Sequence, residues 1–288
     1  MNNSTVNFIT AETSTSFTTN FLMLFTNMDI SMYSLNVLFG LPINSYIIWL
    51  IIKATGSGVA LEFFNLNLSI SEIGVCLNSL FSVFYYCTRF SHLRILTDFL
   101  LGLFITGRAL FQCLMCVERY LAVVHPVTFL KYKPLRYRVI CCTAGWIIIF
   151  GSCLCCMFTA DVNFQIYICL YSIQLLLFFL VQLFCLVAVL RALKQTGPGE
   201  RAREREEENH MKRRAFHLIL ITTVTMAIIY IPLIISGFSF VLMQKFMAKM
   251  FSFGLVCYVL AGFVQPVLYL HRAGKFSCFC CQLNIKLL

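Results

Sequence analysis

The sequence predicts an all-α membrane protein, built as a seven-transmembrane helix bundle with a short C-terminal amphipathic helix. The first observation is composition: of 288 residues, 60% are hydrophobic and only 12% are charged. The second is a mean hydropathy of +0.84. A soluble fold of this size cannot hide so much apolar surface from water, so the chain belongs in a membrane.

The third observation is the length of the apolar runs. Seven of them are long enough to cross a bilayer, which takes about 20 residues of helix. They contain no strict alternation of apolar and polar residues, which argues against a β-barrel, and helices satisfy every backbone polar group in lipid. The seven runs are Ser31–Lys53, Phe63–Tyr86, Thr97–Val124, Val139–Phe158, Ile166–Leu190, Ala215–Leu242 and Met247–Leu270.

Three regions follow from these runs. Residues 1–30 are rich in Ser, Thr and Asn and lack the basic start and apolar core of a signal peptide, so we expect no cleavable signal peptide there. The distribution of basic residues, described next, makes these residues an extracellular tail. Overlapping glycosylation sequons fall at Asn2 and Asn3. Residues 31–270 form the seven-helix transmembrane domain, and residues 271–288 form a cytoplasmic amphipathic helix and tail.

The basic residues predict the orientation. Four of them (Arg89, Arg94, Lys245 and Lys249) lie in the loops after the second and sixth spans, whereas the opposite side carries most of the 22 Lys and Arg residues. Basic loops stay in the cytoplasm, so the N-terminus is extracellular and the C-terminus cytoplasmic in a multi-pass plasma-membrane protein. The net charge of +10 therefore marks a cytoplasmic membrane face and does not indicate nucleic-acid binding.

Neither the cysteines nor the charged run after the fifth span indicates a metal site. The 15 cysteines are scattered through apolar runs and are not arranged as a zinc site, so most are expected to be small buried hydrophobes. We expect no metal and no cofactor. The charged run "KQTGPGERAREREEENHMKRR" begins with the helix breaker Gly197-Pro198-Gly199 and then extends the sixth helix into water.

Short motifs occur in a fixed order along the spans: "GLPINSYIIWL" (40–50), "NLNLSISE" (65–72), "VERYLAVVHP" (117–126), Trp146, "YIP" (230–232), "QPVLY" (265–269) and "KFSCFCC" (275–281). In that order they resemble the helix signatures of rhodopsin-like (class A) G-protein-coupled receptors. The first helix and "RYLAVVHP" are most similar to the purinergic and protease-activated receptor branch.

The resemblance implies a receptor, and no enzyme, that relays an extracellular or membrane-derived signal to heterotrimeric G proteins. Glu118, Arg119 and Tyr120 would be the coupling motif, with Glu118 holding Arg119 at rest. Arrestin, membrane lipids and an unknown small or lipid-like ligand are the further partners expected. The switch positions that the resemblance carries over are Pro126, Tyr230, Pro232, Gln265, Pro266 and Tyr269.

One departure from the family pattern concerns two charges inside the membrane. Glu72 stands where the family usually has an Asp that helps bind sodium, and Arg108 precedes Arg119 by eleven residues, about three helical turns on one face. An unpaired charge at mid-membrane costs about 3 kcal/mol or more. We therefore expect Arg108 to pair with Glu72 and replace the sodium ion. The alternative is a protonated Glu72 with Arg108 bonded to carbonyls.

Further departures bear on the switch and the outer surface. Gln265 replaces an Asn and Tyr230 replaces a Trp; both keep a polar group, so we expect the switch to survive in altered form. Lys212 stands where some members place an acid facing Arg119, so we expect the cross-helix lock to be missing and basal activity to be measurable. Arg94 stands where the family has a disulfide cysteine. The disulfide is then absent or rebuilt from Cys87 and Cys169, or Cys169 is a free thiol inside the fifth helix.

The ligand is the least determined feature. Leu101 occupies the position where amine receptors carry an Asp, which argues against an amine ligand. Tyr85, Tyr86 and Asp98 lie near the expected mouth and, with Leu101, are the candidate ligand contacts. The spans around the expected inner pocket are apolar, so we expect a lipid-like or hydrophobic ligand. Three cysteines after a basic amphipathic segment are candidates for palmitoylation: Cys278, Cys280 and Cys281.

Three alternatives stay open at this point. The first is a chemosensory, odorant-like receptor, which would have the same fold and signalling role with a different ligand. The second is a receptor-like decoy that no longer couples to a G protein. A transporter would need inverted repeats and interrupted helices at matching places in two halves. The sequence shows neither feature, so a transporter is disfavoured.

Overall fold

The computed structural model describes residues 28–53, 62–88, 90–132, 135–159, 164–194, 202–243 and 248–272. Helices make up nearly all of these residues, and no strand occurs among them. The elements are η1 (Asn36–Gly40, a wider π-helical segment), α2 (Leu41–Lys53), α4 (Phe63–Thr88), α5 (Ser91–Val124), α6 (Pro126–Tyr132), α7 (Leu135–Thr159), α8 (Phe164–Lys194), α9 (Ala202–Met243), α10 (Ala248–Ala261) and α11 (Val264–Arg272).

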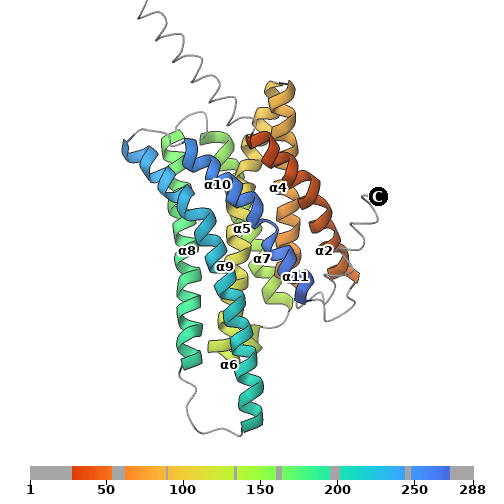
Figure 1. The fold of residues 1–288 in the computed structure, drawn as a ribbon, viewed down its shortest axis with the longest axis vertical. Coiled ribbons are helices and arrows are strands. Elements are labelled where there is room, and N and C mark those ends of the chain that lie inside the picture. The colour runs from red at the N-terminus through yellow and green to blue at the C-terminus, as the bar shows by residue number, and fades with distance from the viewer. Residues whose placement is uncertain are drawn as a thin grey trace, which may run out of the picture.

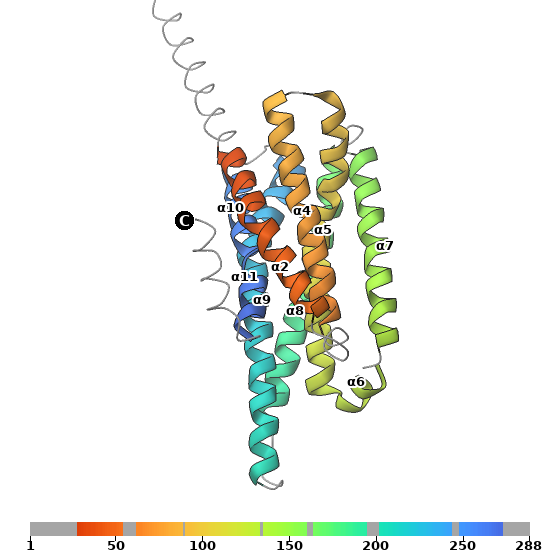
Figure 2. The ribbon, with the colours of Figure 1, turned by 90° about the vertical axis from the view of Figure 1, so that its right-hand side faces the viewer.

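The expected fold class is confirmed. Seven helical stretches in the described part of the chain are long and apolar enough to cross a membrane: Met28–Lys53, Phe63–Thr88, His92–Val124, Leu135–Phe158, Ile168–Ala192, Phe216–Ser239 and Phe253–His271. They run side by side along the long axis of the molecule (Figures 1 and 2). Each overlaps one of the seven runs that the sequence predicted.

Helix α5 is the centre of the bundle. It packs against α4, α7, α8 and α9, and 67% of its membrane window is buried, the largest share among the seven spans. By contrast, α8 buries only 22% of its window, because most of its apolar side chains face outward, where lipid would cover them. Side chains at the centre of the bundle therefore project mainly from α5.

Several helices extend beyond the predicted apolar runs, most clearly the second and third. The third span was expected to begin at Thr97, but α5 begins at Ser91, and α4 continues to Thr88 rather than ending at Tyr86. The two helices reach the same end of the bundle (Figure 2). An apolar run marks only the part of a helix that crosses lipid, whereas the hydrogen-bonded helix continues past it into water.

The expected extension of the sixth span is also helical. Helix α9 begins at Ala202, before the apolar window that starts at Phe216, and its lower end extends beyond the neighbouring helices (Figure 1). Pro232 lies inside α9 without ending it. The C-terminal amphipathic helix predicted within residues 271–288 lies, after Arg272, outside the described residues.

The seventh span is broken. Helix α10 ends at Ala261 and α11 begins at Val264, with a turn at Gly262 and Phe263. The Gly262 amide donates to the carbonyls of Tyr258 (3.2 Å) and Val259 (3.1 Å). Pro266 has no amide hydrogen, so the Gly262 carbonyl cannot receive the helical bond that residue 266 would normally donate. The break thus has a local cause in the sequence.

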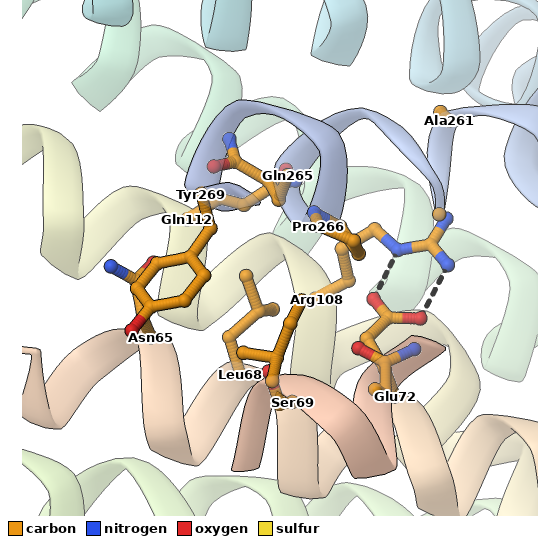
Figure 3. A pocket seen from close by; sticks show the side chains of 13 residues that line it. Asn65, Leu68, Ser69, Glu72, Arg108, Gln112, Ala261, Gln265, Pro266 and Tyr269 are labelled. Atoms are coloured by element: carbon orange, nitrogen blue, oxygen red, sulfur yellow. Dashed lines mark hydrogen bonds and ion pairs between the residues drawn. The ribbon is translucent and has the colours of Figure 1, made fainter. Parts of the chain in front are cut away.

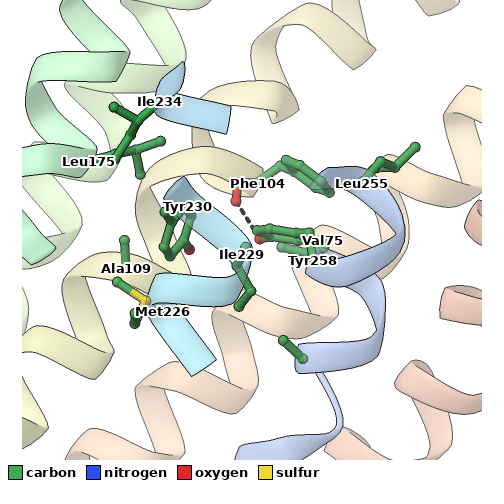
Figure 4. Close-up of a cluster of buried hydrophobic side chains, with 11 residues drawn as sticks. Val75, Phe104, Ala109, Leu175, Met226, Ile229, Tyr230, Ile234, Leu255 and Tyr258 are labelled. Atoms are coloured by element: carbon green, nitrogen blue, oxygen red, sulfur yellow. Dashed lines mark hydrogen bonds between the residues drawn. The ribbon is translucent and has the colours of Figure 1, made fainter. Parts of the chain in front are cut away.

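Apolar side chains of α4, α5, α8, α9 and α10 meet beside this break (Figure 4). The cluster includes Phe104, Met226, Tyr230 and Tyr258, all less than 9% exposed. The rings of Phe104 and Tyr258 stack with centroids 3.9 Å apart, and the Tyr258 hydroxyl donates to the Phe104 carbonyl. This aromatic contact joins α5 to α10. It lies one helical turn before Arg108 on α5.

One contact between α5 and α7 allows no side chain. A Cβ added at Gly102 would lie 2.5 Å from the backbone nitrogen and Cα of Cys153, whereas a Cβ at Gly151 on α7 would meet nothing within 4 Å. Backbone atoms cannot move aside as a flexible side chain can. Gly102 is therefore required for the spacing of these two helices.

We predict that Gly102→Ala destabilises the protein by about 1–3 kcal/mol, because overpacking at a backbone contact forces the helices apart. The matched control Gly151→Ala adds the same methyl group in open space and should be neutral or stabilising by up to about 1 kcal/mol. Thermal unfolding of the detergent-solubilised protein measures both. Equal melting temperatures for the two variants would contradict the prediction.

Candidate functional site

The structure brings Arg108 of α5 and Glu72 of α4 together in the middle of the bundle (Figure 3). Arg108 Nε lies 2.5 Å from Glu72 Oε1, and Nη2 lies 2.7 Å from Oε2. Two parallel N–H···O bonds to one carboxylate are the strongest arrangement that a guanidinium can make. Only 1% of Arg108 and 5% of Glu72 is exposed, so little water screens their attraction.

Arg108 also contacts the seventh span. Its Nη1 donates to the carbonyl of Tyr258 at 2.5 Å, and its guanidinium lies over the Tyr258 ring, 3.8 Å from the centroid. The sequence analysis expected a pair with Glu72 and kept open a protonated Glu72 with Arg108 bonded to carbonyls; the structure contains the pair and, in addition, one carbonyl bond. One side chain thereby joins α4, α5 and α10.

The helix break and the arginine fit each other sterically. A Cβ at Gly262 would lie 2.7 Å from Arg108 Nη2, closer than real Cβ contacts occur. The absence of a side chain at residue 262 therefore leaves room for the guanidinium beside the turn between α10 and α11.

Polar residues of four helices surround the pair: Asn44, Asn65, Ser69, Gln112, Gln265 and Tyr269 are among those that line the remaining space. That space is about 10 Å³, at the lower limit of what one water molecule requires. Gln265 Nε2 donates to Thr222 Oγ1 at 3.1 Å, which links α11 to α9. The ion pair and these side chains together fill the site.

A second charged group lies at the inner end of α5. Glu118 accepts a hydrogen bond from Nη2 of Arg138, a residue in the first turn of α7 with only 5% of its surface exposed. The sequence analysis assigned Glu118 to Arg119 and did not name Arg138. Glu118 and Arg119 line a cavity of about 260 Å³ together with Arg138, at the end of the bundle where α5 stops.

Tyr120 completes the predicted motif. Its hydroxyl lies 3.1 Å from His125 Nε2, and its ring meets the edge of Phe184 on α8 with centroids 5.7 Å apart. Pro126 begins α6 directly after the end of α5 and is exposed. The motif thus occupies the last turns of α5, where three other elements converge.

Among the remaining switch candidates, Tyr230 lies apart from Gln265, Pro266 and Tyr269. Tyr230 is buried in the aromatic cluster, with its ring centroid 6.4 Å from that of Tyr258. Gln265 and Pro266 line the ion-pair site. Tyr269 also reaches that site and packs beside the apolar residues that join α2 to α11.

The candidate ligand contacts lie toward the opposite end of α4 and α5. The Tyr85 and Tyr86 rings are tilted neighbours with centroids 6.0 Å apart. Asp98 forms an ion pair with Arg94 one turn away, at 3.7 Å. Leu101 packs against the buried apolar clusters.

Several sequence predictions concern residues outside the described part of the chain. They are the sequons at Asn2 and Asn3, the acylation sites Cys278, Cys280 and Cys281, and the side chain of Lys212. Cys87 and Cys169 are free thiols, and Cys169 lies inside α8, as one of the open alternatives had it.

Sequence reasoning missed Arg138, Tyr258 and Gly262. Arg138 could have been found as a basic residue at the inner end of the fourth span, within reach of an acid at the inner end of the third. No sequence signal identified the Tyr258 carbonyl, because every residue carries one. Gly262 precedes Pro266 by four residues, which is the spacing of a missing helical hydrogen bond.

Comparison with known proteins identifies the class of protein. Residues 43–269 match the family model described as "7 transmembrane receptor (rhodopsin family)", and the chain therefore belongs to this family. The resemblance that the motifs suggested is confirmed. The protein is thus a multi-pass membrane receptor, and the relatives it matches are receptors rather than enzymes.

Three relatives show how similar the chain is to known receptors. The chain is 25% identical to human C-C chemokine receptor type 8 over 69% of its own length and 60% of the relative's. It is 27% identical to mouse chemokine XC receptor 1 over 64% and 61%. It is 23% identical to the human uracil nucleotide/cysteinyl leukotriene receptor over 88% and 75%. The match spans only about three fifths of each chemokine receptor.

Proposed function

We propose that this receptor lies in the plasma membrane with its N-terminus outside, and that it relays its signal to heterotrimeric G proteins through Glu118, Arg119 and Tyr120. The observation that carries the proposal is the position of Arg119. It lines an open cavity at the inner end of the central helix, and basic residues dominate that side of the sequence. Family membership supports the same role.

The surroundings of Glu118 support a weakly restrained resting state. Its carboxylate accepts a bond from Arg138, so one acid serves arginines on two helices. A carboxylate that also accepts a bond from Arg138 holds Arg119 less firmly than a carboxylate that bonds to Arg119 alone. With Lys212 at the position where some members carry an acid, this arrangement favours signalling without a ligand.

The signal would pass through the polar site in the middle of the bundle. Arg108 joins α4, α5 and α10, and Gln265 joins α11 to α9, so a displacement of the seventh span moves groups on three neighbouring helices. A ligand acting from the outer end would reach this site through Phe104 and Tyr258. Pro266 and the adjacent break give the seventh span a natural hinge.

We assign the ligand to the lipid-like or otherwise apolar class, with Tyr85, Tyr86, Asp98 and Leu101 as the candidate contacts. The apolar cluster beneath these residues favours such a ligand. One relative is named for a leukotriene and a nucleotide, and two for chemokines. Arrestin would engage the same inner end as the G protein.

The test of coupling is ligand-free recruitment of G-protein subunits in cells, read for each subunit class. Wild type should recruit at least one class above background. Arg119→Ala should fall to background, because the group that meets the G protein is removed. The control Arg136→Ala removes an exposed arginine at the same end of the bundle and should retain the wild-type signal. No recruitment by wild type in any class would identify a non-coupling decoy instead.

A second prediction concerns sodium. Because Arg108 occupies the place of the ion, the melting temperature of wild type should be the same in sodium chloride and in potassium chloride of equal concentration. Arg108→Ser leaves the Glu72 carboxylate without its guanidinium and should acquire stabilisation by sodium. The proposal fails if sodium stabilises wild type and Glu72→Ala abolishes that effect.

A further inference from the structure

Two adjacent threonines of α9 differ in their hydrogen bonding. Thr222 Oγ1 donates to the Leu218 carbonyl at 2.7 Å and accepts a bond from Gln265 Nε2 at 3.1 Å, which ties α9 to α11. Thr223 is only 3% exposed, and its hydroxyl has no hydrogen-bond partner within the described part of the chain. Consecutive residues of an α-helix point about 100° apart, so the two hydroxyls face different neighbours of α9.

A glutamine of α8 is buried in the same way. Gln182 is 0% exposed, and neither Nε2 nor Oε1 of its amide has a hydrogen-bond partner among the described residues. A buried polar group without a hydrogen bond costs free energy, and lipid offers no substitute partner. The described arrangement of α8 and α9 therefore leaves the polar atoms of Gln182 and Thr223 unsatisfied by protein groups.

Gln182 and Thr223 lie in the same layer of the bundle. Toward the end where α5 stops, Cys185 of α8 and Ile219 of α9 belong to one buried cluster. Toward the other end, both helices enter the apolar cluster of Figure 4, to which Met226 belongs. Helices α8 and α9 pack against each other, and each of the two polar residues stands between these two clusters on its own helix. Their side chains are therefore at the same depth on adjacent helices.

The two side chains are also chemically complementary. The Gln182 amide can donate to the Thr223 hydroxyl, and the hydroxyl can donate to the amide oxygen. Thr222 and Gln265 already form a bond of this kind on the α11 side of α9. One helix thus carries two adjacent threonines with a glutamine for each, and the described structure contains only the bond to Gln265.

We propose that α9 moves between two positions that exchange these bonds. In the described position Thr222 is bonded to Gln265 of α11. In the second position α9 moves toward α8 by about 1–2 Å, as helices do in switching proteins. The bond between Thr222 and Gln265 breaks there, and Thr223 bonds to Gln182. Because one neutral hydrogen bond replaces another, the two positions are close in free energy. That the second position is the coupling one rests on the proposed function, but the exchange itself does not.

The first measurement needs no G protein. The full chain in detergent carries ¹³C in its methionine methyl groups, and Met226→Leu assigns the resonance of Met226. This fully buried side chain follows the two threonines by one turn of α9, so its resonance reports the position of the helix. Gln182→Leu removes the second bond, whereas Thr222→Val removes the first. The two variants should therefore move the Met226 resonance in opposite directions from wild type.

A matched control separates the exchange from the loss of any hydroxyl. Thr225 donates to the Ile221 carbonyl of its own helix at 2.8 Å. Thr225→Val makes the same chemical change as Thr222→Val but removes no bond to another helix that the exchange uses. It should leave the Met226 resonance within the wild-type line width.

The second measurement is ligand-free recruitment of G-protein subunits. One neutral hydrogen bond changes the ratio of two states by about twofold to tenfold. Gln182→Leu should therefore lower recruitment at least about twofold, and Thr222→Val should raise it at least about twofold. If either variant does not fold, Thr223→Val should repeat the result of Gln182→Leu, and Gln265→Leu that of Thr222→Val.

Three results would overturn the inference. They are a shift of the Met226 resonance in the same direction in both variants, no shift in Gln182→Leu, and a lower melting temperature for Gln182→Leu than for Thr225→Val. The last result would show that a buried water satisfies the Gln182 amide in the described position. If wild type recruits no G protein but the resonance moves in opposite directions, the exchange stands and only its link to coupling fails.

Discussion

The structure depends on the guanidinium of Arg108, which is buried in the middle of the bundle. Arg108 projects from the most buried helix into the middle of a membrane bundle, where an isolated charge costs about 3 kcal/mol or more. Glu72 neutralises it with two hydrogen bonds, and the carbonyl and ring of Tyr258 occupy its remaining faces. Because these partners come from α4 and α10, the requirement to neutralise one charge determines how three helices meet.

The details of the seventh span follow from the same requirement. Gly262 leaves the space that the guanidinium occupies, and Pro266 ends the regular hydrogen bonding that would otherwise pass through the turn. The side chains around Arg108 and Glu72 leave room for at most about one water molecule, which supports the proposal that this pair replaces the sodium ion of the family pattern. We therefore expect the conformational balance of this receptor to be independent of the ion.

The sequence predicted the bundle well because the membrane imposes a simple pattern: an apolar run of sufficient length must be a helix. It also predicted the meeting of Arg108 and Glu72, since two charges in adjacent spans have few other partners. It did not predict that Arg138 holds Glu118. Helical spacing tells which face of a helix a residue occupies, but not which neighbour that face meets. Two arginines lie within reach of Glu118, and only the packing of α7 against α5 brings Arg138 into contact with it.

The most direct measurement is a double-mutant cycle on the apparent free energy of unfolding, with Glu72→Gln, Arg108→Gln and the double variant. If the pair neutralises itself, each single variant leaves one buried charge alone and costs about 3–5 kcal/mol, whereas the double variant is less destabilised than either single one. Additive losses, with the double variant destabilised by the sum of both, would show that the two charges do not depend on each other and would contradict the account.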